Sequence, residues 1–233
     1  METPPAISAR DVGRRFTGRW AVRGITLDIG ASQMVMLHGP NGSGKTTLLR
    51  VLSSAISPSQ GEVRVHGVPA IEARRRIALL SHADGHYDEL SGRDNLALAK
   101  ELGKMPGSVE AMLEAVGLAS RAGDPVRAYS AGMRKRLAFA RLLLKEADVV
   151  CLDEPYAALD PAGHALVDEI LRQLRARQAT VLVSTHQVRH VAGLVDHAIR
   201  LEGGRLAEQG PAAQALTQHV SPGAPAALPS GDA

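Results

Sequence analysis

The glycine-rich octapeptide at residues 39–46 constrains the fold of this chain more than any other segment. It reads Gly39-Pro40-Asn41-Gly42-Ser43-Gly44-Lys45-Thr46, which fits the phosphate-loop pattern G-x-x-x-x-G-K-[ST]. The apolar run 34–37 before it is short enough for a buried strand, and apolar residues follow it at helical spacing over 47–52. Strand, glycine loop and helix together predict an α/β domain with a site for a nucleoside triphosphate.

The residue types in this loop suit the binding of phosphate groups. Glycines let successive backbone N–H groups converge on phosphate oxygens, and the following helix adds the positive end of its dipole. Lys45 can reach the β- and γ-phosphates, Thr46 can offer a hydroxyl to Mg²⁺, and Thr47 begins the helix beside them. The loop and Thr47 are therefore the predicted nucleotide-binding residues. The alternative is an ordinary glycine-rich turn between a strand and a helix.

Length and composition allow a globular α/β protein and argue against several other classes. At 233 residues the chain can bury one large core, with or without an inserted subdomain. Its net charge is only +3 and its arginines are spread along the chain, so no nucleic-acid partner is expected. No apolar segment is long enough for a signal peptide or a membrane span. The single cysteine, Cys151, cannot form an internal disulfide, which suits a reducing compartment, and we expect it to be a small core residue. We expect a cytoplasmic protein without direct membrane insertion.

The order of apolar patterns along the chain predicts an interrupted α/β domain. The first third contains short strand-like segments at 6–12, 21–29, 34–37, 62–66 and 76–80. A helical pattern over 91–145 predicts an inserted helical subdomain at about 88–145. Two continuous apolar runs, 149–152 and 180–183, flank a helix-like stretch at 163–177 and form a predicted βαβ unit. We expect one domain over 1–218 and a disordered tail over 219–233, which is rich in Pro, Gly and Ala.

Two acids follow the apolar run 149–152 and suit phosphate chemistry. Asp153 at the end of that strand can hold the Mg²⁺ and its water shell, and Glu154 is placed to take a proton from an attacking water. An apolar run followed by two acids is commonplace by itself. Its meaning here comes from the phosphate loop elsewhere in the same chain.

Several motifs in the same order resemble the nucleotide-binding subunit of ATP-binding cassette (ABC) transporters. They are the loop 39–46, the segments Leu152-Asp153-Glu154-Pro155 and Ala158-Leu159-Asp160, and His186. The resemblance covers roughly residues 6 to 215. It implies a P-loop NTPase fold of the α/β class, with an inserted helical subdomain and an antiparallel β subdomain. It also implies that ATP and Mg²⁺ are the cofactors and that ATP is hydrolysed to drive transport.

The resemblance further implies a head-to-tail homodimer in which each ATP lies between one subunit's phosphate loop and the other's signature segment. The segment Tyr129-Ser130-Ala131-Gly132-Met133 resembles the family's L-S-G-G-Q. Ser130 can cap a helix that begins near Gly132, so a hydroxyl, backbone N–H groups and a positive helix end would point at a γ-phosphate. Ala131 and Met133 depart from the family pattern, and we expect weaker but functional binding of ATP between the subunits.

Three further positions correspond to functional sites of the family, two with the family's residue type and one with a different residue. His186 matches the switch histidine, catalytic in the family through its contact with the γ-phosphate, although a polar cap at a strand end is the alternative. His82 stands where the family usually has Gln, and its imidazole can still hydrogen-bond a catalytic water near the γ-phosphate, although it is a poorer Mg²⁺ ligand than an amide oxygen. A surface histidine without a role is the alternative. Phe16 matches the aromatic residue that stacks on adenine, and Trp20 is a near alternative.

A transporter without spans of its own requires integral membrane permease subunits as partners. The resemblance implies that the loop around His82 and residues 85–89 docks the cytoplasmic helices of the permease, which would place the protein at the inner face of the cell membrane. The short chain, the signature form and Thr185-His186-Gln187 are most similar to the heme exporter ATP-binding subunits of cytochrome c maturation.

Other readings of the same motifs remain open. Drug, lipid and polysaccharide exporters of the same short type share many of these features, because the permease determines the cargo. A soluble ABC ATPase that acts on nucleic acid usually has two cassettes or a long coiled-coil insertion, and neither is present. A pseudoenzyme is disfavoured because Lys45, Asp153, Glu154 and His186 are all present.

Overall fold

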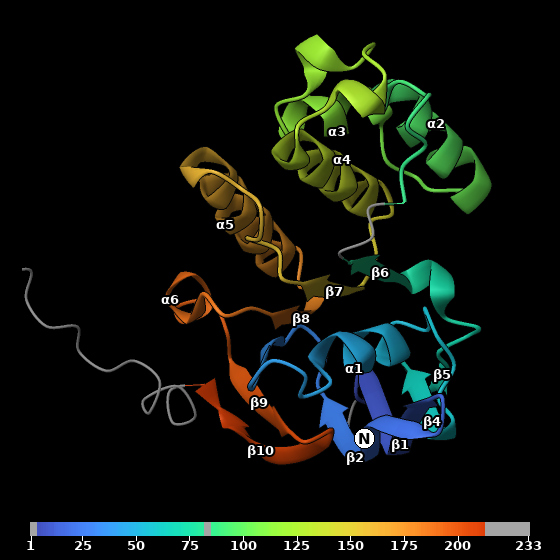
Figure 1. Ribbon diagram of the computed structural model, residues 1–233, viewed down its shortest axis with the longest axis vertical. Coiled ribbons are helices and arrows are strands. Elements are labelled where there is room, and N and C mark those ends of the chain that lie inside the picture. Colours follow the sequence, from blue (N-terminus) through green and yellow to red (C-terminus); the bar gives the residue numbers. More distant parts are fainter. Residues whose placement is uncertain (1–3, 82–84, 213–233) are drawn as a thin grey trace, which may run out of the picture.

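The computed structural model describes residues 4–81 and 85–212. His82 and the predicted tail at 219–233 lie outside these residues. The described part forms two sheets and a group of helices (Figure 1). Within 4–81 and 85–212, no helix combines the length and the apolar character that a membrane span needs.

The central sheet has six strands in the order β10-β9-β3-β8-β7-β6. Five of them run parallel: β9 (His197–Glu202), β3 (Met34–His38), β8 (Thr180–Ser184), β7 (Val149–Asp153) and β6 (Ile77–Leu80). The edge strand β10 (Arg205–Pro211) pairs with β9 in the antiparallel direction. In the register of this sheet Asp153 lies opposite Ser184, so β7 and β8 end side by side.

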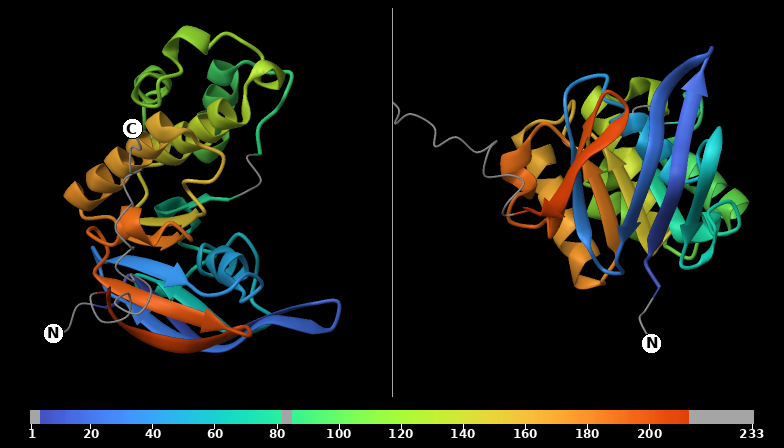
Figure 2. Two further views of the ribbon diagram at one scale, coloured as in Figure 1. Left: turned by 60° about the vertical axis from the view of Figure 1, so that its left-hand side comes forward. Right: turned by 90° about the horizontal axis from the view of Figure 1, so that it is seen from below.

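A second, antiparallel sheet has the strand order β2-β1-β4-β5. Its strands are β1 (Ile7–Phe16), β2 (Arg19–Ile29), β4 (Gln60–Val65) and β5 (Val68–Pro69). Figure 2 shows this sheet on the side of the central sheet opposite to most of the helices. Helix α1 (Lys45–Leu52) packs with strands of both sheets, since its buried leucines belong to the same apolar cluster as Ile7 and Cys151.

The central strands are buried on both faces, and alternate residues of each strand enter different cores. Val150 and Leu152 of β7 belong to the cluster that contains α5 (Pro161–Ala176), whereas Val149 and Cys151 belong to the cluster with α1 and the antiparallel sheet. This is the two-residue period of a strand. The continuous apolar runs that predicted β7 and β8 follow from this double burial.

Helices α2 (Gly92–Gly103), α3 (Val109–Ala115) and α4 (Ala131–Leu144) lie together, with α4 packed between the other two and the sheet (Figure 1). Three serines cap their N-termini: Ser91, Ser108 and Ser130 each accept a hydrogen bond from a backbone N–H three residues on. We propose that these helices form the inserted subdomain expected at about 88–145. A four-residue helix, α6 (Val188–Val191), follows β8.

The structure moves several expected boundaries and adds a hairpin that the sequence analysis did not predict. The helix expected at 163–177 is α5, which begins two residues earlier because Asp160 caps it and Pro161 occupies its first position. Arg76 belongs to a short 3₁₀ turn rather than to the following strand. The hairpin of β9 and β10 turns at Gly203 and Gly204, both with positive φ.

Candidate functional site

The phosphate loop joins β3 to α1, and two of its glycines, Gly39 and Gly44, occupy positions where a side chain would not fit. Gly39 has φ of 140°, and a Cβ there would lie 2.1 Å from the carbonyl oxygen of Leu201. Gly44 has φ of 101°, and its Cβ would lie 2.6 Å from the carbonyl oxygen of Ala21. These contacts explain the glycines by backbone geometry and close packing.

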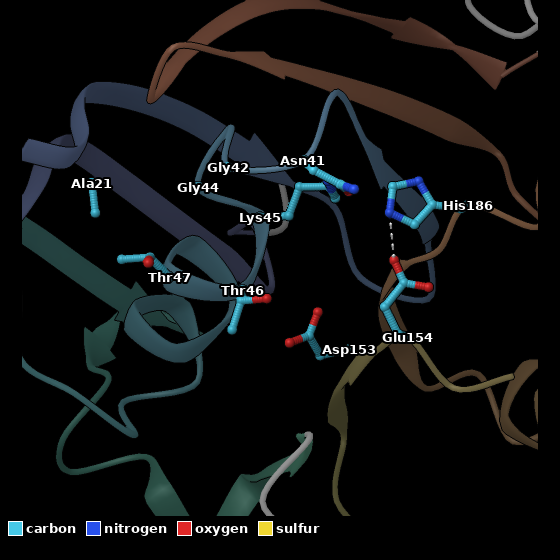
Figure 3. Close-up of a pocket in the computed structure, with 10 residues that line it drawn as sticks. All are labelled: Ala21, Asn41, Gly42, Gly44, Lys45, Thr46, Thr47, Asp153, Glu154 and His186. Atoms are coloured by element: carbon cyan, nitrogen blue, oxygen red, sulfur yellow. Dashed lines mark ion pairs between the residues drawn. The ribbon is translucent and has the colours of Figure 1, made fainter. Parts of the chain in front are cut away.

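The loop opens into a cavity of about 360 Å³. Its lining brings together the loop, the end of β7 and the segment after β8 (Figure 3): Ala21, Asn41, Gly42, Gly44, Lys45, Thr46, Thr47, Asp153, Glu154 and His186. The Lys45 ammonium donates hydrogen bonds to the carbonyl oxygens of Gly39 (2.8 Å) and Pro40 (3.0 Å). Gly39 and Pro40 themselves line an adjoining cavity of about 490 Å³ that also reaches His186.

Asp153 is a buried carboxylate in the wall of the cavity. Its side chain is only 2% exposed, and Oδ1 accepts a 2.6 Å hydrogen bond from Ser184 Oγ. Its Oδ2 is buried without a hydrogen-bond partner in the described residues, and the Thr46 hydroxyl faces the same space (Figure 3). A carboxylate and a hydroxyl are the hard oxygen ligands that Mg²⁺ prefers. These residues therefore fit a nucleotide-bound magnesium ion.

The loop itself contains a second buried polar group without a partner. Ser43 Oγ is buried and has no hydrogen-bond partner among the residues that the structure describes. Ser43 is 2% exposed, and Lys45, two residues further along the chain, is 8% exposed. A phosphate group is the ligand that would satisfy such donors.

Glu154 and His186 form a pair at the rim of the cavity. Glu154 Oε1 lies 3.3 Å from His186 Nε2, and the Glu154 side chain is much less exposed than the histidine. Helix α5 and strand β8 separate these residues in the sequence, and the adjacent ends of β7 and β8 bring them together. Glu154 Oε1 has no hydrogen-bond partner among the described residues, so the acid and the imidazole approach each other without a formed hydrogen bond.

Two residues of the site were missed by sequence reasoning. Ser184 holds Asp153, and Lys135 of α4 donates a 3.1 Å hydrogen bond from Nζ to the carbonyl oxygen of Glu154. Burial lowers the pKa of Lys135, and the nearby carboxylates of Asp153 and Glu154 oppose that effect. Ser184 directly precedes Thr185-His186, so strand pairing could have pointed to it. No motif pointed to Lys135.

The signature segment lies apart from the phosphate loop within one chain. Ser130 caps α4 by accepting a 3.2 Å hydrogen bond from the Met133 N–H, which confirms the predicted cap. A cavity of about 390 Å³ is lined there by Gly117, Leu118, Arg121, Ser130, Gly132, Met133, Arg136, Ala158 and Asp160. Ser130 and Gly132 therefore do not meet the phosphate loop of their own subunit, as a head-to-tail dimer would require.

The two aromatic candidates lie on the hairpin of β1 and β2. Phe16 is 43% exposed with the Arg14 guanidinium 4.7 Å from its ring centroid, and Trp20 is 38% exposed between Arg15 and Arg23. In the described part of the chain the cavity lining includes their neighbour Ala21 but neither aromatic ring. Adenine stacking by Phe16 stays a prediction, and His82 lies outside the described residues.

A parallel sheet whose strand β3 runs into a glycine loop, with acids at the end of β7 two strands away, defines a P-loop nucleoside triphosphatase. Residues 22–157 match the family described as ABC transporter, and the chain belongs to that family. It is an ATP-binding subunit of an ABC transporter, its domain type implies ATP hydrolysis, and such domains bind ATP with Mg²⁺.

The chain matches relatives over at least 88% of its own length and over 68–89% of theirs. The chain is 32% identical over 225 residues to the Nod factor export ATP-binding protein I of Ralstonia nicotianae, covering 93% of this chain and 70% of that protein. It is 31% identical to the ABC transporter ATP-binding protein NatA of Bacillus subtilis (88% and 89%). It is 35% identical to the daunorubicin resistance ATP-binding protein DrrA3 of Streptomyces coeruleorubidus (89% and 68%).

Solved structures share the fold at lower identity. The ATP-binding subunit of an ABC transporter superimposes with a TM-score of 0.82 at 23% identity, covering 92% of this chain and 93% of that one. A dimeric ATP-binding cassette bound to ADP and phosphate superimposes with a TM-score of 0.80 at 22% identity, covering 88% and 98%. These matches confirm the predicted fold class.

Proposed function

We propose that this chain is the ATPase subunit of an ABC export complex in which Glu154 is the general base for ATP hydrolysis. The observation that carries the proposal is the 3.3 Å approach of Glu154 Oε1 to His186 Nε2 at the rim of the phosphate-loop cavity. A base must lie within hydrogen-bond reach of the water that it activates, and the rim beside the loop is where that water would sit.

The other residues of the cavity bind the phosphates, hold the Mg²⁺ and orient the attacking water. Lys45 exchanges the carbonyl oxygens of Gly39 and Pro40 for the β- and γ-phosphates when ATP binds. Thr46 and Asp153 would hold the Mg²⁺, which offsets charge on the phosphates. Glu154 takes the proton of the attacking water. His186, the partner of Glu154 at the rim, orients that water and the γ-phosphate.

A second copy of the chain would complete each site. ABC ATPase domains generally act as dimers together with membrane permeases. In a homodimer, the partner's signature segment would bring the Ser130 hydroxyl and the N-terminus of α4 to the γ-phosphate, with Gly132 leaving room for it. The separation of the two half-sites within one chain supports this arrangement.

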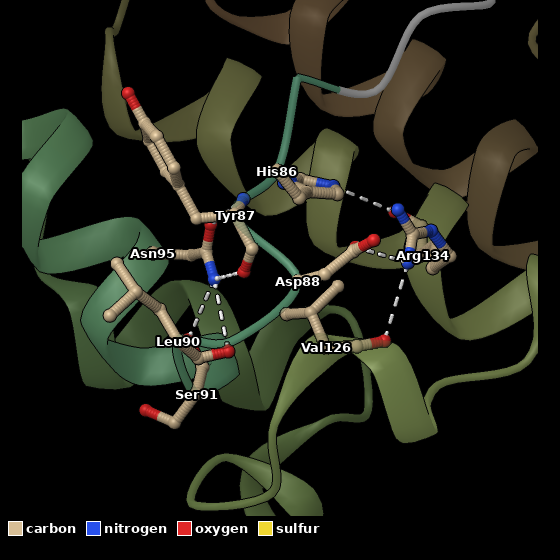
Figure 4. A network of polar contacts seen from close by, with 8 residues as sticks. All are labelled: His86, Tyr87, Asp88, Leu90, Ser91, Asn95, Val126 and Arg134. Carbon is tan, nitrogen blue, oxygen red and sulfur yellow. Dashed lines mark hydrogen bonds and ion pairs between the residues drawn. The ribbon is translucent and has the colours of Figure 1, made fainter.

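The loop before α2 is the proposed contact for the permease. Figure 4 shows how Asn95 fixes this loop: its amide oxygen accepts from the Tyr87 N–H (2.8 Å), and its nitrogen donates to three carbonyl oxygens, those of Tyr87, Leu90 and Ser91. Asp88 pairs with Arg134 at 2.7 Å. The Tyr87 ring points away from this network and is 59% exposed, so a rigid loop presents an aromatic side chain to a partner. Through such a partner the chain would lie at the cytoplasmic face of the cell membrane.

Heme is the proposed cargo, for cytochrome c biogenesis, on the basis of the sequence features described above. Two of the relatives named above are named for other compounds, one for Nod factor export and one for daunorubicin resistance. The competing proposal is therefore another short exporter, for a drug, a lipid or a polysaccharide. ATPase activity of the chain reconstituted with its permease subunits distinguishes them, because the cargo should stimulate hydrolysis. Stimulation by heme supports heme export, and stimulation only by another compound overturns it.

The role of Glu154 is tested by Glu154→Gln. This variant should bind ATP and form a stable ATP-bound dimer, while the hydrolysis rate falls at least about a hundredfold because the base is lost. The matched control is Glu72→Gln, which changes an exposed acid away from the cavity. Hydrolysis at the wild-type rate in Glu154→Gln would exclude Glu154 as the base.

A further inference from the structure

The backbone of Glu154 adopts a conformation that is unfavourable for its residue type. Its φ is 46°, in the left-handed region that non-glycine residues seldom enter. Such a conformation persists only where surrounding contacts hold it, and it is concentrated at functional sites. The contacts of the Glu154 peptide groups therefore decide where its carboxylate points.

Three hydrogen bonds hold this residue's backbone, and they come from different parts of the chain. The Glu154 N–H donates to the carbonyl oxygen of Ser184 on β8 at 2.9 Å. The Glu154 carbonyl oxygen accepts from the Ala157 N–H at 3.2 Å and from Lys135 Nζ at 3.1 Å. The first two bonds lie within the βαβ unit. The third reaches from helix α4, 19 residues earlier in the sequence.

Lys135 also lies close to the two acids of the site. Its ammonium is near enough to Asp153 and Glu154 for both carboxylates to stabilise its charge, while Lys45 is bonded to the carbonyls of the phosphate loop. Lys135 is half-buried, so its ammonium is shielded from bulk water and the attraction is stronger than at the surface. A lysine here contributes both a hydrogen bond to the strained peptide and a local positive charge.

The helix that carries Lys135 begins with the signature segment. Ser130 caps α4, and Lys135 follows in its second turn. The same short stretch of helix thus contacts the Glu154 carbonyl oxygen of its own subunit through Lys135 and, in the proposed dimer, faces the nucleotide of the partner through Ser130.

We propose that Lys135 is a positioning residue for ATP hydrolysis, which holds the strained Glu154 peptide so that the Glu154 carboxylate faces His186. This inference rests on the proposed role of Glu154 as the base. It assigns a function in hydrolysis to the helix α4 within its own subunit, in addition to the signature function toward the partner.

The first test is Lys135→Met, which keeps the length of the apolar stem and removes the ammonium. The kcat for ATP hydrolysis should fall by about tenfold or more, because misplacement of a catalytic group is costly, while KM for ATP stays within about twofold. Lys145→Met is the matched control, since Lys145 is a half-buried lysine at the other end of α4. If Lys135→Met does not fold, Lys135→Leu provides the same kinetic test, because its side chain also has no hydrogen-bond donor.

Chemical rescue separates positioning from a structural role. In Lys135→Cys the only other cysteine is Cys151, which is fully buried, so a thiol reagent should modify position 135 alone. Alkylation with 2-bromoethylamine rebuilds a side chain of lysine length with an amine and should restore kcat. Alkylation with an unbranched propyl halide of the same length adds no amine and should not. Equal activity after both treatments would overturn the proposal.

Parallel measurement of Glu154→Gln keeps the two proposals distinct. If Glu154→Gln loses hydrolysis but Lys135→Met retains the wild-type kcat, only the inference about Lys135 fails. If Glu154→Gln hydrolyses ATP normally, the proposed function of Glu154 fails first. When both proposals hold, adding Lys135→Met to Glu154→Gln lowers kcat little further, because the two residues act through one group.

Discussion

Ser184 Oγ donates a 2.6 Å hydrogen bond to Asp153 Oδ1 between the paired ends of β8 and β7. The carbonyl oxygen of the same serine accepts the Glu154 N–H at 2.9 Å. One fully buried residue of the neighbouring strand therefore fixes both acids of the site. Ser184 also ends β8 just before Thr185 and His186, so the same residue connects His186 to the two acids.

Ser184→Ala should raise the Mg²⁺ concentration needed for half-maximal ATP hydrolysis several-fold, because the Asp153 carboxylate loses the donor that orients it. It should also lower the free energy of unfolding by about 1–3 kcal/mol, since a buried carboxylate oxygen is left unsatisfied. Magnesium titration of hydrolysis and urea unfolding measure the two effects. Ser53→Ala removes another buried hydroxyl, one that donates to the Arg50 carbonyl oxygen, and is the control. An unchanged Mg²⁺ requirement in Ser184→Ala contradicts the orienting role.

Local signals made most of the phosphate-binding half of the site predictable. The spacing of the loop 39–46, the acids after an apolar run and the serine before a helix are all read within a few neighbouring residues. Ser184 and Lys135 depend instead on strand register and on the face of a helix, over 31 and 19 residues of sequence. Neither quantity can be obtained from a short sequence pattern.

The same distinction applies to the fold. The buried strands β7 and β8 were predictable because burial on both faces makes their sequences continuously apolar. The edge strand β10 is mostly polar and exposed, so its sequence resembles a loop, and its pairing with β9 defines it. Phe16 matched a family position, but the ring's place relative to the cavity depends on the twist and bulges of the β1–β2 hairpin.

Cys151 should not react with thiol reagents while the protein is folded. Burial raises the pKa of its thiol to about 12, so the thiolate is scarce at neutral pH and the sulfur is also shielded from solvent. Ellman's reagent should therefore titrate no thiol in native protein at pH 8 and one in denaturant. Rapid titration of the native protein would show that β7 opens or that this core is loosely packed.

Asp196 should contribute stability that disappears in acid. Burial acts to raise its pKa, but hydrogen bonds from the Arg175 side chain and the Met34 N–H outweigh it, and the pKa is lowered. A depressed carboxylate stabilises the fold above its unfolded pKa of about 3.9, and this contribution is lost as the pH falls through the lower folded value. Asp196→Asn should thus be less stable than wild type at pH 7, with a smaller difference below about pH 4. Urea unfolding at several pH values measures this, and a difference independent of pH contradicts it.

Tyr156 should stabilise the segment after Glu154 through its hydroxyl. Its side chain is buried, its Oη donates a 2.7 Å hydrogen bond to Asp168 Oδ1 on α5, and burial raises its pKa, as does Asp168. The ring also stacks on His190 of α6 at 4.7 Å between centroids. Tyr156→Phe keeps the stacking and should lower the free energy of unfolding by about 1 kcal/mol. Tyr87→Phe, at an exposed ring, is the control, and an equal loss in both variants would contradict the role of the buried hydroxyl.

Substitutions of Phe16 and Trp20 should have different effects, one on ATP affinity and the other on the stability of the fold. The Trp20 ring covers Gly13, where an added Cβ would lie 2.7 Å from Cζ3, so this ring packs on β1. Phe16 ends the same strand with an exposed ring, backed by the guanidinium of Arg14. Phe16→Ala should therefore weaken ATP binding by about 1–3 kcal/mol, as expected for one stacked base.

Inorganic triphosphate provides the control for that measurement, because it occupies the phosphate loop and has no base to stack. Its affinity should be unchanged in Phe16→Ala. Trp20→Ala should chiefly lower the melting temperature and leave the preference for ATP over triphosphate intact, because its ring stabilises the hairpin. If Trp20→Ala removes that preference and Phe16→Ala does not, then Trp20 is the residue that stacks on adenine, and the family position has moved four residues along the hairpin.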